Sequence, residues 1–349
     1  MDAARRAARI EHCGHGVFAV DSGYVRPGFD AIHLIVEAGR AAIVDTGTSH
    51  SVPRVLAALD ALGVAPGCVD FVVLTHVHLD HAGGAGALMR ALPEARLTVH
   101  PRGARHMIDP TRLWQATCAV YGREAAEALY GEIVPIDPQR VLETGDGASV
   151  TVAGRTLEFL DTPGHARHHV TIRDSATGHL FAGDTFGVSY RELDVAGRPF
   201  VFPSSTPVQF DPDALQRSLA RLLALAPEAV YLTHYSKRGD VARLGADQQA
   251  LIERYAQIAL SHADAGDARR SGIAAELRAL LLGAARAHGV TLDDARILAL
   301  IGADIELNAD GLVDWLDARE RSKPDAHASE PQRPRARSTT PANAHGATR

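Results

Sequence analysis

Cysteine, lysine and long apolar runs are all scarce in this sequence. Its three cysteines, Cys13, Cys68 and Cys118, are scattered and odd in number, and no CxxC pair occurs. This usage indicates free thiols in a reducing compartment rather than a disulfide framework. No stretch approaches the length of a membrane span, and residues 1–10 lack the apolar run of a secretory signal. We therefore expect a cytoplasmic protein without a membrane partner.

Positive charge is also limited. The 36 lysines and arginines are outweighed by 42 aspartates and glutamates, and the formal net charge is -6. Only Lys237 and Lys323 are lysines, which we interpret as compositional bias rather than chemistry. A chain without a basic field is a poor candidate for binding nucleic acid, so we expect a small-molecule substrate. The 349 residues, of which 46% are hydrophobic, can bury one large catalytic core with an appendage.

Short apolar runs, glycine turns and helical patterns alternate between residues 16 and 234, which is typical of an α/β fold. We take residues 1–238 as the catalytic domain. The expected strands are apolar or β-branched and cover 31–37, 41–45, 71–75, 97–100, 156–160, 179–182 and 229–233. The expected helices are amphipathic and cover 52–62, 86–92 and 213–225, the last after an Asp211-Pro212 start signal.

The character of the chain changes beyond residue 239. No strand pattern remains in 239–322, and amphipathic periodicity predicts helices at 247–262, 272–287, 292–301 and 309–319. Two roles stay open for this helical segment, covering part of the substrate pocket or forming the interface of a homodimer. Residues 323–349 are rich in small and polar residues, proline and arginine, so we expect a disordered tail.

An apolar run ending in three imidazoles and a carboxylate is the most informative stretch of the sequence. It reads Phe-Val-Val-Leu-Thr-His-Val-His-Leu-Asp-His over 71–81. On an extended segment His76 and His78 project to the same side, while Asp80 and His81 follow where the chain turns toward two glycines. A single histidine here would usually be a hydrogen-bonded strand end. Four ionisable groups this close oppose one another's burial unless a cation compensates them, so the pattern predicts a metal site.

Three later segments offer the further ligands that such a site needs. His165 stands in a Thr-Pro-Gly-His loop, Asp184 ends an apolar run in Phe-Ala-Gly-Asp, and His234 ends Val-Tyr-Leu-Thr-His. For each segment alone, a turn or a strand end is the simpler explanation, but together the three segments favour a metal site. Imidazole and carboxylate ligands without thiolate suit zinc, manganese or iron.

The ordered set HxHxDH, a later His, an Asp after Gly and a last His resembles the metallo-β-lactamase superfamily, and its all-His/Asp form is most similar to the glyoxalase II branch. The resemblance covers about 16–234 and implies a four-layer αβ/βα sandwich, here with a helical C-terminal extension. It also implies that His76, His78 and His165 bind one ion, that Asp80, His81 and His234 bind a second, and that Asp184 bridges them. Asp45 matches the family's aspartate that supports the ligands from behind.

This resemblance implies a metal-dependent hydrolase with two divalent ions, zinc before iron or manganese. Such ions lie about 3.5–4 Å apart and hold a shared hydroxide, which attacks the substrate while one ion polarises the scissile oxygen. Asp80 and Asp184 are the expected catalytic carboxylates. The expected substrate is a thioester, ester or lactone. The alternative is a mononuclear iron persulfide dioxygenase, which resembles the same branch and keeps the same histidines.

Departures from the family pattern narrow the range of possible substrates. Glyoxalase II enzymes usually carry a lysine and tyrosine motif for glutathione after the bridging aspartate, whereas this chain reads Thr-Phe-Gly-Val-Ser-Tyr-Arg over 185–191. This difference disfavours glutathione thioesters. Tyr190 and Arg191 are candidate substrate contacts, although a packing or surface role is the simpler explanation of each. His168 and His169 adjoin His165, but we expect them to begin the next strand without binding metal.

Overall fold

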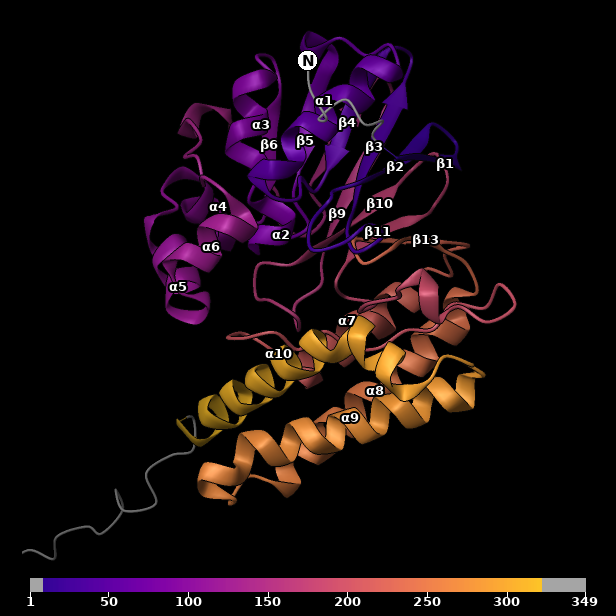
Figure 1. Cartoon of the computed structure of the whole chain (residues 1–349). Helices are drawn as coiled ribbons and strands as arrows, with labels where there is room; N and C mark the ends of the chain where they lie inside the picture. Colours follow the sequence, from indigo (N-terminus) through magenta and orange to yellow (C-terminus); the bar gives the residue numbers. More distant parts are fainter. Residues whose placement is uncertain (1–8, 322–349) are drawn as a thin grey trace, which may run out of the picture.

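Two β-sheets form the centre of the molecule (Figure 1). The computed structural model describes residues 9–321, so the predicted tail at 323–349 lies outside the described residues. The first sheet has seven strands in sequence order, antiparallel from β1 to β4 and parallel from β4 to β7. Its strands are β1 (Ile10–Gly14), β2 (Val17–Asp21), β3 (Ala31–Glu37), β4 (Arg40–Val44), β5 (Val69–Val73), β6 (Arg96–Val99) and β7 (Val141–Glu143).

The second sheet has six strands and only one parallel pair, β11 with β12. Its strands are β8 (Ser149–Val152), β9 (Arg155–Asp161), β10 (Val170–Asp174), β11 (Leu180–Gly183), β12 (Val230–Leu232) and β13 (Ser236–Arg238). The α-helices are α1 (Val52–Ala61), α2 (Leu79–Ala82), α3 (Ala85–Ala91), α4 (Pro101–Ile108), α5 (Thr111–Tyr121), α6 (Arg123–Tyr130), α7 (Pro212–Leu223), α8 (Val241–Ser261), α9 (Arg269–His288) and α10 (Asp294–Arg321).

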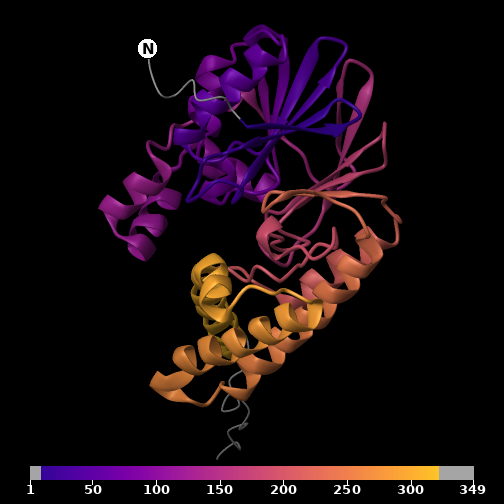
Figure 2. The same cartoon turned by 45° about the vertical axis from the view of Figure 1, so that its right-hand side comes forward.

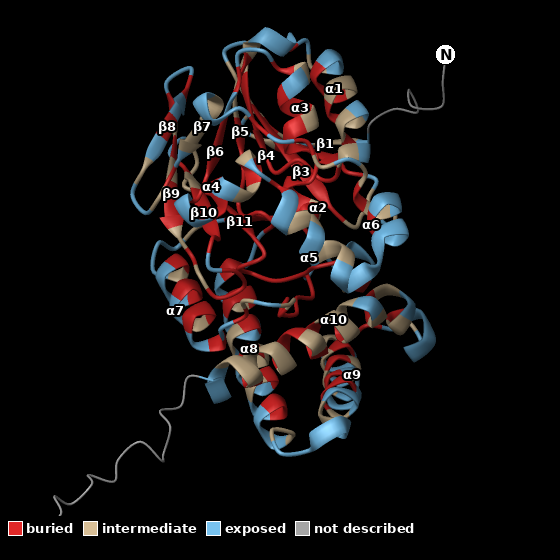
Figure 3. Cartoon of the chain, turned by 90° about the vertical axis from the view of Figure 1, so that its left-hand side faces the viewer, coloured by how far each residue is buried: buried red, intermediate tan, exposed pale blue. Residues whose placement is uncertain are grey.

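Three layers of buried side chains hold the sandwich together. Between the sheets, Ile35 and Val44 of the first sheet belong to one core with Phe159 and Phe181 of the second. A second core joins the first sheet to α1, α3 and α4, and a third joins the second sheet to α7 and the C-terminal helices. In Figure 3 the strands are mostly buried, whereas α5 and α6 are largely exposed. The predicted four-layer sandwich with a helical extension is confirmed.

The C-terminal helices lie together on the side of the molecule away from α1 and α3 (Figures 1 and 2). Their buried side chains share a core with α7, so the apolar packing runs across residue 238. A domain boundary at this residue stays a prediction. None of the helices within residues 9–321 is long and apolar enough to cross a membrane.

One predicted break in the helical segment is wrong. The expected helices at 292–301 and 309–319 are a single helix, α10, which runs through Gly302 and Gly311. Each glycine costs about 1 kcal/mol relative to alanine in a helix interior. Burial of a large aliphatic side chain contributes about 1.5–3 kcal/mol. Since Ile297, Ile301 and Ile305 recur every four residues and are fully buried, packing outweighs the two glycines.

Several elements have no counterpart among the sequence expectations. They are the helices α2 and α4 to α6 and the strands β1, β2, β7, β8 and β13. The strand expected to begin near His168 and His169 is β10, which starts at Val170. The start of α7, in contrast, follows its signal, because the Asp211 carboxylate accepts a hydrogen bond from Ala214 N at 2.9 Å and Pro212 occupies the first turn.

Candidate metal centre

The candidate ligands stand where strands of both sheets end. His76 and His78 follow β5, Asp184 follows β11 and His234 follows β12. Because β4 and β5 are parallel, and so are β11 and β12, their carboxyl ends meet at shared sheet edges. His165 comes from the connection between β9 and β10. The two sheets thus bring together residues that are far apart in the sequence.

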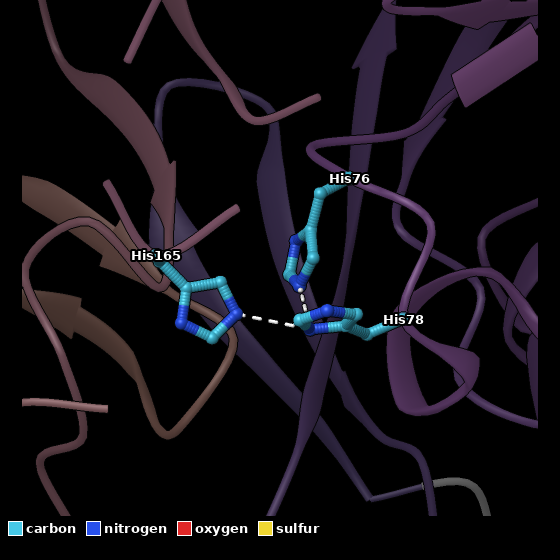
Figure 4. Close-up of side chains that lie close together, drawn as sticks. All are labelled: His76, His78 and His165. Carbon is cyan, nitrogen blue, oxygen red and sulfur yellow. Dashed lines mark hydrogen bonds between the residues drawn. The ribbon is translucent and has the colours of Figure 1, made fainter. Parts of the chain in front are cut away.

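His76, His78 and His165 form the first candidate group, and Figure 4 shows their rings pointing toward one another. His78 Nδ1 lies 2.9 Å from His76 Nε2 and 3.0 Å from His165 Nε2. His165 Nδ1 lies 3.1 Å from the carbonyl oxygen of Ser204, to which it must donate. In the neutral imidazole, His165 Nε2 therefore presents a lone pair to the other rings.

Burial and the neighbouring imidazoles determine the charge of this group. Both lower the pKa of His76 well below its usual range, with burial the larger cause. The pKa of His78 is lowered in the same way, first by burial and then by His165 and other imidazoles. Neutral imidazoles with converging lone pairs are the form in which histidine binds a cation.

Asp80, His81 and His234 form the second candidate group. Asp80 Oδ2 lies 3.7 Å from His81 Nε2 and 3.6 Å from His234 Nε2. The other ring nitrogens face carboxylates, with His81 Nδ1 2.9 Å from Asp45 Oδ2 and His234 Nδ1 2.7 Å from Asp30 Oδ1. Although burial lowers the pKa of His81, Asp184, Asp80 and Asp45 together raise it to about 9.

Asp184 lies between the two groups. Its Oδ2 is 3.5 Å from His165 Nε2, whereas its Oδ1 is 3.3 Å from His81 Nε2 and 3.7 Å from His234 Nε2. Burial alone would raise the pKa of this carboxyl, but the surrounding imidazoles, His81 and His234 foremost, hold it below its usual range. One ionised carboxylate therefore offers one oxygen to each side.

The donor set fits divalent metal ions. His81 Nε2 and Asp184 Oδ1 are buried and lack a hydrogen-bond partner among the described residues. Such unpaired buried atoms cost free energy unless another group satisfies them. A third set, His76, His81 and Asp184, connects the two groups. Within each of the three sets the donor atoms lie within 4.8 Å of one another. Imidazole nitrogen and carboxylate oxygen donors at this spacing suit ions of borderline hardness.

Asp45 supports the centre from behind, in the place that the sequence predicts. Its carboxylate accepts hydrogen bonds from Thr75 N at 2.8 Å and from Thr233 Oγ1 at 3.0 Å, and it faces His81 Nδ1. It therefore connects the end of β4 to the segments that follow β5 and β12. Asp30, which faces His234 Nδ1 and is 1% exposed, was not predicted. A lone aspartate before a strand carries no local signal of this role.

Replacing Asp45 with asparagine tests this support. The amide has only one acceptor oxygen in place of the two that Asp45 offers to Thr75, Thr233 and His81. The His81 ring therefore loses the partner that fixes its orientation. We expect metal affinity to fall about 10–100-fold, the usual cost of losing a partner of a ligand. Competition with a chelator on the purified protein measures this affinity. Asp60→Asn on the exposed side of α1 is the control, and equal affinities for the two variants would contradict the role of Asp45.

The candidate substrate residues lie outside the three sets. Tyr190 is fully buried, and its hydroxyl donates to Asp304 of α10 at 3.2 Å. Arg191 forms an exposed ion pair with Glu11 at 3.1 Å. Their role as substrate contacts stays a prediction. His169, just before β10, accepts a hydrogen bond from Asp184 N at 3.2 Å and so helps to hold the segment after β11.

Two sheets with a histidine and aspartate cluster at their shared edge define a class of metal-dependent enzyme. Residues 25–234, more than half of the chain, match the family model of the metallo-beta-lactamase superfamily. The chain belongs to this superfamily. With the family, the predicted class of metal-dependent hydrolase is confirmed, and the fold implies that the chain binds divalent metal.

Similar proteins agree with this assignment. A metallo-beta-lactamase fold-containing protein of Sulfurisphaera tokodaii is 25% identical over 228 residues, which are 63% of this chain and 78% of the relative. A hydroxyacylglutathione hydrolase of Xanthomonas axonopodis pv. citri is 28% identical over 207 residues, 58% of this chain. The match spans only 60% of the length of that relative.

A solved structure shows the same fold. The crystal structure of a metallo-beta-lactamase family protein from Thermus thermophilus superposes with a TM-score of 0.61 at 22% identity. The superposition covers 87% of this chain and 94% of that one. The likeness therefore extends beyond the residues that match the family model.

Proposed function

We propose that this protein hydrolyses a thioester, ester or lactone with two divalent ions, zinc in the first instance. His76, His78 and His165 would hold one ion, and Asp80, His81 and His234 the other. The observation that carries the proposal is the division of the two Asp184 oxygens, one toward His165 and the other toward His81 and His234. A carboxylate placed in this way can bridge two cations.

Two bound ions would supply an acidified water and a Lewis acid for the scissile oxygen. The residues of the chain orient the metal ligands and provide a proton acceptor. Asp30 and Asp45 hold the rings of His234 and His81 with their Nε2 atoms facing inward. Asp80 has a side chain that is 23% exposed, which makes it the carboxylate most accessible to substrate and the candidate acceptor for the proton of the attacking water.

A hydrolase of this kind needs no serine or cysteine nucleophile, and the sequence contains no GxSxG elbow. The relatives named hydroxyacylglutathione hydrolase favour a thioester. The missing lysine and tyrosine motif after Asp184 argues against glutathione as the leaving group. We also propose that the substrate is a small molecule and that the reaction takes place in the cytoplasm, which is compatible with the three free cysteines.

One arrangement in the centre favours a second candidate function. His76, His81 and Asp184 by themselves form a set of two imidazoles and one carboxylate. This set is typical of mononuclear iron oxygenases. The alternative function is therefore a persulfide dioxygenase with one iron ion.

Elemental analysis of the purified protein, combined with activity assays, separates these functions. We expect about two zinc ions per chain and cleavage of at least one of a thioester, an ester and a lactone. One iron per chain and oxygen uptake with a persulfide would replace the hydrolase by the dioxygenase. Two bound ions without cleavage of any of the three bond types would contradict the proposed reaction.

A further inference from the structure

Helix α10 is hydrogen-bonded to a segment beside the metal centre, Pro203 to Ser205. The side chain of Asn308 accepts a hydrogen bond from Ser205 N at 2.7 Å and donates one to the carbonyl oxygen of Pro203 at 3.0 Å. We call these contacts between Asn308 and the segment the clamp. The Ser205 hydroxyl also donates to the carbonyl oxygen of Asn308 at 3.0 Å. Asn308 is 1% exposed and Ser205 is fully buried, so water does not compete for these bonds.

The backbone of α10 also lies very close to this segment. A Cβ atom added to Gly311 would stand 1.5 Å from the carbonyl oxygen of Ser205. Only glycine permits this approach. Asn308 and Gly311, three residues apart, lie on the same face of the helix. The helix therefore grips the segment at two adjacent points.

The residue in the middle of the gripped segment orients a candidate ligand. Ser204 lies between the two residues that Asn308 holds, and its carbonyl oxygen accepts the Nδ1 proton of His165 at 3.1 Å. This bond leaves His165 Nε2 facing His78 Nδ1. The His165 ring thus takes its tautomer and its direction from a carbonyl group whose position depends on α10.

We propose that Asn308 is a positioning residue for the first metal ion, which makes the helical extension part of the metal centre. Asn308 acts through Ser204 and His165 and does not itself touch the ion. The inference rests on the proposed ligand role of His165. It also gives the C-terminal helices a role distinct from covering the pocket or forming a dimer.

The apolar packing of α10 does not by itself require this clamp. Ile301, Ile305 and Leu312 already bury the helix in the core that it shares with α7 to α9. An apolar residue at position 308 would avoid the cost of desolvating an amide, whereas Asn308 needs every partner it has. A buried amide that joins a helix to one short segment is expected where the position of that segment matters.

Cobalt titration of the full-length protein tests the proposal. The metal-free wild type should take up Co²⁺ in two steps with distinct visible absorption. In Asn308→Leu we expect the step of the His76, His78 and His165 group to weaken about tenfold, the lower end of the range for a lost partner of a ligand. His165→Ala identifies this step in the titration. Nitrogen NMR of labelled histidines in the metal-free protein should show His165 leaving its single Nδ1-protonated form.

Ile305→Ala is the matched control, because Ile305 is fully buried on the same helix and is absent from the clamp. It should lower the melting temperature while both Co²⁺ steps stay within twofold of the wild type. Should Asn308→Leu fail to fold, Ser205→Ala removes only the hydroxyl and should weaken the same step several-fold.

Three results would overturn the inference. The first is a Co²⁺ affinity of Asn308→Leu within twofold of the wild type at the step of the His76, His78 and His165 group. If Asn308→Leu does not fold, the same result for Ser205→Ala counts instead. The two steps could instead weaken equally, as a general loss of stability would cause. In both of these cases the proposed function stands. A His165→Ala variant that binds Co²⁺ as the wild type does would overturn the ligand assignment itself, and the inference with it.

Discussion

Replacement of Asp184 by asparagine is expected to abolish turnover while the protein stays folded. The neutral amide has a single oxygen and can no longer face both histidine groups, which the carboxylate contacts with separate oxygens. Loss of a partner that only supports a ligand costs about 10–100-fold in activity, so loss of the bridge should cost more than about 100-fold. Bound metal should fall below two ions per chain. Steady-state kinetics and elemental analysis of the same preparation measure both effects.

Asp213→Asn serves as the control for this variant, since Asp213 is exposed in the first turn of α7. Circular dichroism should give the same secondary structure for both variants and the wild type. If Asp184→Asn retains full activity with two ions bound, the bridge is misassigned.

The second large effect concerns stability. It arises from the buried ion pair of Arg155 and Asp174, neither of which is a candidate metal ligand. Arg155 Nη2 lies 2.6 Å from Asp174 Oδ2, and both side chains are at most 2% exposed. Removing one partner of a buried pair leaves an uncompensated charge and costs about 3–5 kcal/mol. We expect the free energy of unfolding of Arg155→Met to fall by this amount. Urea denaturation at pH 7 measures it.

The loss should also depend on pH. Burial raises the pKa of Asp174, but hydrogen bonds from Arg155 and Thr177 outweigh it and hold the pKa below the usual value. The ionised carboxylate therefore stabilises the wild type above pH about 4, and this contribution disappears as the pH falls through the lowered pKa. Without Arg155, burial dominates, so the variant gains relative stability as Asp174 takes up a proton. The difference between the two proteins should shrink from pH 7 to pH 4.

Arg173→Met on the neighbouring strand is the matched control. Arg173 pairs with Glu158 at 3.6 Å, and both side chains are more than 40% exposed. Such surface pairs contribute about 0–1 kcal/mol. A loss for Arg155→Met no larger than that for Arg173→Met, or one independent of pH, would contradict the role of the buried pair.

The candidate ligands could be predicted because their signals are local. His76, His78, Asp80 and His81 stand together after an apolar strand, and the order of the remaining residues resembles a known family. The structure brings all seven predicted ligands together. Their binding of metal stays a prediction that the Asp184 and His165 variants test.

The supporting residues could not be predicted, since their partners are distant in the sequence. Asp30 and His234 are 204 positions apart, and their side chains meet only because the residue before β3 adjoins the end of β12. Ser204 and Asn308 likewise belong to no motif that the sequence shows. A single aspartate, serine or asparagine carries no periodicity, and its role depends on which atoms the fold places opposite it.

Helix α10 shows which features the local sequence determined and which features tertiary packing decided. Its local periodicity predicted two helices, 292–301 and 309–319, with a break after Ile301 that contains Gly302. By itself the sequence determined the apolar periodicities, the family and the residues available as ligands. Tertiary structure decided that burial of one isoleucine stripe carries the helix through both glycines, and that Asn308 then reaches the segment beside His165. These outcomes depend on contacts between distant residues, whose free energies exceed the local preferences they oppose.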